Sequence, residues 1–130
     1  MSRLITRLAG MATAAAALGT VMACGVLGAS GDNKAACDAI KSDIQQVTAD
    51  GMKQSGNQAG LEQVYRKGAD NVRAEAEKAD GDVADAGKEV ADEFDKLGDF
   101  VKNLSASNTG FPDTSGLTTA GAKLKKACDG

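Results

Sequence analysis

The sequence predicts an all-α protein: a small up-down-up-down four-helix bundle, closed by one disulfide and preceded by a signal peptide. Apolar residues recur at spacings of three and four along most of the chain after residue 33, and no segment alternates like a strand. Alanine is abundant and Pro112 is the only proline, so few residues break helices. We expect a signal peptide over residues 1–23, a lipid-attachment cysteine with a flexible tether over 24–33, and one helical domain over 34–130.

The first 23 residues have the parts of an export signal. Arg3 and Arg7 give a basic start, and the run from Leu8 to Ala23 contains no charge. A basic start followed by an apolar stretch that ends in small residues is typical of a secretory signal peptide. The alternative is an uncleaved transmembrane anchor, but the stretch is shorter than the roughly 20 strongly apolar residues that a span needs.

Residues 21–24, Val-Met-Ala-Cys, resemble a bacterial lipobox, with an aliphatic residue, a small residue and then the cysteine. The resemblance implies cleavage before Cys24, a diacylglyceryl group on its sulfur, and further acylation by a fatty acid such as palmitate. Two or more acyl chains anchor a protein stably at a membrane. Ordinary cleavage after Ala23 or Gly28 is the alternative. Both routes predict an extracytoplasmic mature chain.

The first two helices are expected over residues 33–50 and from residue 57 or 58 to 79. Asp32 or Asn33 can cap the first helix, and Asp50-Gly51 can end it. The inward residues are Cys37, Ile40, Ile44 and Val47 in the first helix, and Leu61, Tyr65, Gly68, Val72 and Ala76 in the second.

The third helix, expected over residues 82–106, has the clearest periodicity. Its two heptad positions hold Val83, Val90, Leu97 and Leu104, and Gly87, Phe94 and Val101. A loop over 107–113 contains Gly110 and Pro112, and a fourth helix follows over 114–128, with Leu117, Gly121, Leu124 and Cys128 inward. Four helices with one apolar stripe each bury those stripes by packing together as a bundle.

Three glycines, Gly68, Gly87 and Gly121, fall on inward helix faces. Each costs about 1 kcal/mol relative to alanine in a helix interior. Close approach of neighbouring helices would explain them, and chance in a glycine-rich chain is the alternative.

The bundle topology predicts a disulfide between Cys37 and Cys128. The end of the fourth helix lies beside the start of the first, and both cysteines share the apolar phase of their helices. Two buried free thiols are the alternative, which is unusual outside the cytosol.

No catalytic residue, cofactor or metal site is expected. The chain has no histidine, which removes the usual general base and most transition-metal sites. The carboxylates Asp92, Glu93, Asp95 and Asp99 fall on a polar helix face, where salt bridges are the expected role. Residues 80–85 have the acid spacing of a calcium loop, but the glycine is not at the sixth position and Ala91 stands where the bidentate glutamate belongs, so a helix stop and cap explain them better.

Two short segments have more than one interpretation. Residues 123–126, Lys-Leu-Lys-Lys, suit the C-terminal end of a helix dipole, with anionic lipid as the alternative contact. Phe111-Pro112 is expected as an apolar cap on the bundle end, with an exposed partner contact as the alternative.

Composition excludes some functions and points to the cell envelope. From Gly25 onward there are 13 Lys and Arg against 18 Asp and Glu, a net charge of −5, which disfavours nucleic-acid binding. The whole chain resembles the small secreted or lipid-anchored helical proteins of actinobacteria, which implies an envelope location. We expect a non-enzymatic lipoprotein that contacts an envelope component or protein partner. The alternatives are a freely secreted inhibitor or immunity-type binder, or a small-ligand or lipid carrier.

Overall fold

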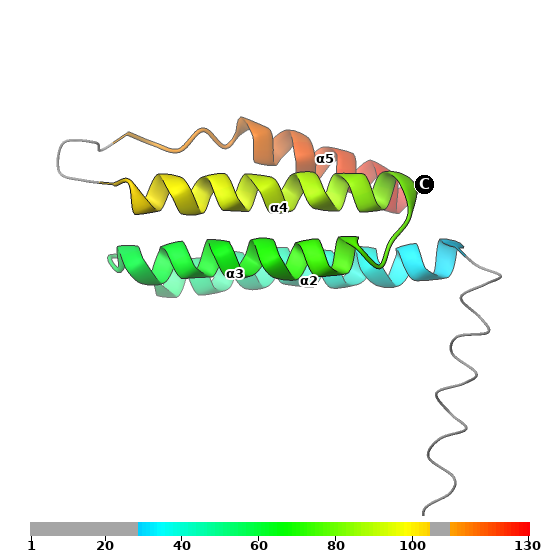
Figure 1. Ribbon diagram of the computed structural model, residues 1–130, viewed down its shortest axis with the longest axis horizontal. Helices are drawn as coiled ribbons and strands as arrows, with labels where there is room; N and C mark the ends of the chain where they lie inside the picture. Colours follow the sequence, from blue (N-terminus) through cyan, green and yellow to red (C-terminus); the bar gives the residue numbers. More distant parts are fainter. Residues whose placement is uncertain (1–28, 105–109) are drawn as a thin grey trace, which may run out of the picture.

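The computed structural model describes residues 29–104 and 110–130, and within them the chain forms four helices and no strand. They are α2 (Ala29–Lys53), α3 (Gln58–Ala76), α4 (Gly81–Lys102) and α5 (Ser115–Asp129). Successive helices run in opposite directions (Figure 1), so the predicted up-down-up-down four-helix bundle is confirmed. None of the helices in the described residues is both long and apolar enough to span a bilayer.

Helix α2 begins earlier than predicted. Residues 29–33, expected as the end of a flexible tether, are helical, while residues 1–28, with the predicted signal peptide, Cys24 and the rest of the predicted tether, lie outside the described residues. Asp32 does not precede the helix but lies in its first turn, where a carboxylate suits the positive end of the helix dipole. Asn33 is also inside the helix, and its Oδ1 accepts a hydrogen bond of 2.8 Å from the Asp80 backbone N–H.

Helices α3 and α4 end three or more residues before the predicted positions. The chain turns after Ala76, and the Asn103 N–H bonds to the Asp99 and Phe100 carbonyls as α4 ends. Leu104, predicted as the last residue of the heptad stripe, therefore follows the helix and is only partly buried. The predicted start of α3 holds, because the Asn57 side chain accepts a hydrogen bond from the Gly60 N–H.

Helix α4 is the central element of the core. The six predicted heptad residues from Val83 to Val101 are all buried, and so are alanines beside them such as Ala86 and Ala91. Val90 of α4, Val72 of α3 and Ile40 of α2 are the largest fully buried side chains in the described residues, and they belong to one cluster. The apolar stripe that periodicity identified is therefore the surface on which the other helices pack.

Two of the three inward glycines permit close helix approach. A Cβ on Gly87 would lie 2.7 Å from the Cβ of Ala76 in α3, and a Cβ on Gly68 would collide with the Val47 side chain of α2. Gly121 of α5 differs, because a Cβ there would meet nothing within 4 Å. Close approach thus explains Gly68 and Gly87 but does not explain Gly121.

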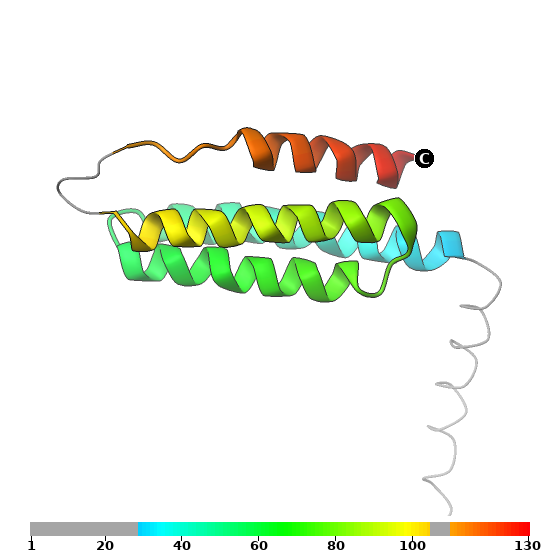
Figure 2. The same cartoon turned by 45° about the horizontal axis from the view of Figure 1, so that its top comes forward.

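Helix α5 is attached differently from the others. It lies along α4 (Figures 1 and 2), and only Ala120 and Leu124 are fully buried on it, with Leu117 and Cys128 partly buried. Glu93 of α4 holds its carboxylate against Gly116 in the first turn of α5, where a Cβ would collide with it. A negative charge there stabilises the helix end, and α5 has no acid of its own in that turn.

We predict opposite effects for alanine at two of the inward glycines. Gly87→Ala should lower the free energy of unfolding by about 1–3 kcal/mol, because the new methyl group overpacks the α3–α4 contact. Gly121→Ala, the matched control, should raise it by up to about 1 kcal/mol through helix propensity alone. Urea unfolding followed by circular dichroism measures both. Equal effects of the two substitutions would contradict the packing explanation.

Candidate functional site

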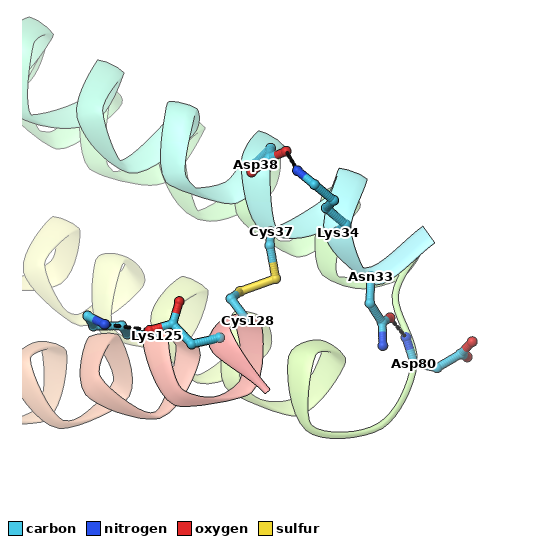
Figure 3. Close-up of a disulfide and its surroundings, with 8 residues drawn as sticks. Asn33, Lys34, Cys37, Asp38, Asp80, Lys125 and Cys128 are labelled. Atoms are coloured by element: carbon cyan, nitrogen blue, oxygen red, sulfur yellow. Dashed lines mark hydrogen bonds and ion pairs between the residues drawn. A yellow bond between two sulfur atoms is a disulfide. The ribbon is translucent and has the colours of Figure 1, made fainter. Parts of the chain in front are cut away.

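The disulfide predicted between Cys37 and Cys128 is present. It joins α2 to the end of α5, with an S–S distance of 2.04 Å and a Cα–Cα distance of 5.8 Å (Figure 3). Cys37 is buried in a small cluster with Ala36, Ala79 and Val83, and Cys128 is partly buried against it. The bridge therefore joins α2 and α5 covalently at one end of the bundle, packs against Val83 of α4, and serves a structural role.

The carboxylates of α4 form the predicted salt-bridged face. Arg73 of α3 donates to Asp95 at 2.8 Å and to Asp92 at 3.2 Å, and Arg66 donates to Asp99 at 2.6 Å. Asp95 lies between the two guanidinium groups, since Arg66 Nη1 is 3.9 Å away from it. These hydrogen bonds raise the pKa of both arginines. Every carboxylate in this set is engaged by a cation, since Lys96 pairs with Glu93 as well, so the predicted salt bridges are present.

Acids also engage the basic segment near the end of α5. Lys123 donates to both carboxylate oxygens of Glu89 on α4, at 2.7 and 3.0 Å, and Lys125 donates to Asp129. The hydrogen bond to Lys125 lowers the pKa of Asp129. Lys123 therefore fastens α5 to α4, whereas the Lys125 ion pair lies within α5 at its C-terminal end.

An uncharged groove lies between α2 and α5, at the bundle end opposite the disulfide. One wall is α2 from Val47 to Met52, the other is Pro112 with the start of α5, and Phe94 and Leu97 of α4 line it between them. Its volume is about 600 Å³. We call this feature the α2–α5 groove. It is open to solvent, and α2 and α5 contact each other much less than either contacts its neighbour α3 or α4.

Phe111 does not cap the bundle end as predicted. Its side chain is 97% exposed, although the next residue, Pro112, lines the α2–α5 groove. Met52, also at the groove, is 70% exposed, and these two are the only large apolar side chains exposed in the described part of the chain. The alternative interpretation of Phe111-Pro112, an exposed contact, matches its position.

The described residues hold no group of three or more His, Cys, Asp or Glu side chains placed to bind a metal. Residues 80–85 instead form the turn between α3 and α4 and the first turn of α4 (Figure 3). Gly81 there has a φ of +58°, a conformation that favours glycine. No protein-family model, curated protein or solved structure matches the chain.

We predict that loss of the disulfide has a large effect on stability. In the chain-entropy model, a bridge with a sequence separation of 91 residues contributes about 4–5 kcal/mol. The double variant Cys37→Ser/Cys128→Ser should lose about that much free energy of unfolding, measured in urea against the oxidised protein. An unchanged urea midpoint in the double variant would show that the packing of α5 beside α2 does not depend on the disulfide.

Two aspartates on α2 should affect stability with opposite signs. Partial burial, with a smaller contribution from Glu75, raises the pKa of Asp43, whereas the hydrogen bond from Lys34 lowers the pKa of Asp38. A carboxyl group whose pKa is raised on folding destabilises the folded state when the pH is above its pKa in the folded protein. This destabilisation vanishes when the pH falls below the pKa of the unfolded chain, about 3.9. Asp43→Asn should therefore stabilise the protein at pH 7 and not below about pH 4.

Asp38→Asn is the control, because it removes a carboxylate that the folded state favours. It should destabilise the protein slightly at pH 7, and its effect should also disappear in acid. Urea unfolding of both variants at the two pH values measures this. An equal gain from Asp43→Asn at both pH values would exclude the electrostatic origin.

Proposed function

We propose that the protein is a non-enzymatic extracytoplasmic bundle, lipid-anchored through Cys24, that acts by surface contacts with a protein or another envelope component. The observation that carries the proposal is the Cys37–Cys128 disulfide, because such bridges form and persist in oxidising compartments outside the cytosol. The lipobox-like residues 21–24 supply the second support, since they explain the third cysteine as an attachment point.

The bundle would be held close to the membrane with a defined end outward. Only four residues separate Cys24 from Ala29, where α2 begins, so an anchored chain reaches at most about 20 Å from the lipid to the helix. Cys37 lies near this start, and the α2–α5 groove lies beside the far end of the helix, which is about 37 Å long. The disulfide end would then face the membrane and the groove end would face outward.

The charges and side chains of the bundle support contact rather than catalysis. Asp92, Glu93, Asp95 and Asp99 of α4 are paired with arginine or lysine, and the lining of the α2–α5 groove carries no charge. The freely secreted binder, the main alternative, would use the same surfaces. It differs from the lipoprotein only in the fate of Cys24. Intact mass spectrometry of the native protein distinguishes the two.

We predict that intact mass spectrometry of the protein from its own host will find a chain that starts at Cys24, with a diacylglyceryl group and at least one fatty acyl chain. Cys24→Ala should move the protein from the membrane fraction into the medium. Met22→Ala, which gives the lipobox a more usual residue, is the matched control and should stay in the membrane. An unmodified chain in the medium would favour the secreted binder, and a chain in the cytoplasm would contradict the proposal.

A further inference from the structure

Helix α5 consists of two segments that differ in helix propensity. Residues 115–121, Ser-Gly-Leu-Thr-Thr-Ala-Gly, include two glycines, two threonines and a serine, which form helices less readily than alanine. Residues 122–128, Ala-Lys-Leu-Lys-Lys-Ala-Cys, are mostly strong helix formers. We call residues 115–121 the first half of α5 and residues 122–129 the second half. The first half is intrinsically the less stable helix.

The second half is fastened to the rest of the bundle in three ways. Cys128 is bonded covalently to Cys37 of α2 (Figure 3), and Leu124 is buried in the core. Lys123 donates to both carboxylate oxygens of Glu89 on α4, at 2.7 and 3.0 Å. These contacts hold the second half on both α2 and α4.

The first half is held more weakly. Ala120 is buried but small, and Leu117 is only partly buried. The hydroxyls of Thr118 and Thr119 each donate to the backbone carbonyl four residues earlier, so these hydrogen bonds are local. Glu93 of α4, whose carboxylate meets the first turn of α5, already pairs with a lysine of its own helix. Two apolar side chains therefore provide most of the attachment of the first half.

Gly121 lies where the two halves meet. A Cβ there would meet nothing within 4 Å, so close packing does not require glycine at this position. Glycine lowers the stability of a helix interior and has the widest choice of backbone conformations. A point at which the helix can unwind or bend would account for this glycine.

The first half also borders the α2–α5 groove. Leu117, together with Thr114 and Pro112 just before the first half, lines one wall, and Phe94 and Leu97 of α4 lie between that wall and α2. Movement of the first half away from α4 would widen the groove and expose more of both α4 side chains. Exposure of apolar side chains to water is unfavourable, so the open form would be a minor state.

We propose that Gly121 is a hinge, at which the first half of α5 opens away from α4 while the second half stays fastened. Residues 115–121 then act as a lid beside the α2–α5 groove, and the disulfide keeps α5 on the bundle when the lid is open. The inference goes beyond the proposed function and does not depend on it, because it concerns a motion within the bundle.

The test is amide hydrogen exchange of the oxidised protein isolated from its host, measured by mass spectrometry at single-residue resolution. Each helical N–H donates to the carbonyl four residues earlier. Opening of residues 115–121 therefore releases the amides of residues 119–125 and leaves those of residues 126–128 bonded. Protection against exchange should be about tenfold or more lower for the first set than for the second, as expected for a locally opening segment.

Two substitutions separate local opening from unfolding of the whole bundle. Gly121→Ala should raise the protection of amides 119–125 about fivefold, because alanine favours the helical form of the hinge. Val72→Ala is the contrasting variant, since Val72 lies fully buried in α3, which packs on α2 and α4. It should lower the protection of the Val90 amide in α4 about tenfold or more and leave amides 119–125 unchanged.

Equal protection of amides 119–125 and 126–128 would overturn the inference, because α5 would then open as one piece. It would also be overturned if Val72→Ala lowered the protection of both α4 and amides 119–125 to the same extent, since exchange would then require global unfolding. No change in amides 119–125 on Gly121→Ala would exclude the hinge. These outcomes leave the proposed function standing, because the location and lipidation of Cys24 test it separately.

Discussion

The close contact between α3 and α4 is the interaction on which the rest of the bundle depends. Gly87 of α4 lets Ala76 of α3 approach within a distance that any side chain would prevent, and Ile40 of α2 packs onto the same point. Outside this core, Arg66 and Arg73 of α3 join the two helices through exposed ion pairs with α4. Such pairs fix the alignment of the two helices and contribute little to the free energy of unfolding. Helix α2 packs mainly on α3 of this pair, and helix α5 packs mainly on α4.

The weak contact between α2 and α5 has structural consequences at both ends of the bundle. At one end the disulfide supplies a covalent link where apolar contact is limited, and Lys123 and Glu89 hold α5 onto α4. At the other end nothing in the described residues replaces that link, so the two helices leave the α2–α5 groove between them. The same shortage of contact that makes the disulfide important thus leaves the uncharged α2–α5 groove open to solvent.

Periodicity predicted most of the fold, because large apolar residues occupy the inward positions of every helix. The heptads of α4 gave its buried face but placed its end four residues too late, and helix phase together with topology gave the disulfide. Contacts that join sequence-distant polar groups could not be predicted in this way. Asn33 looked like a cap for its own helix, but its side chain instead accepts a hydrogen bond from the Asp80 N–H. Gln58 donates to the Val101 carbonyl in the last turn of α4 and to the Leu104 carbonyl just beyond it. Both depend on which helix ends meet in space.

The candidate site was the least predictable part, for a physical reason. Phe111 has the composition of a core residue, and burial of an aromatic ring is the favoured outcome for an isolated chain. Its exposure follows from the path of residues 110–114, which bring Pro112 to the groove wall and leave the preceding side chain in solvent. An apolar side chain that remains exposed beside an unfilled apolar groove retains a free-energy gain that only a further contact can realise. That gain distinguishes this end of the bundle from the disulfide end, where the neighbouring hollow is lined by charged side chains such as Asp85, Glu89 and Lys123.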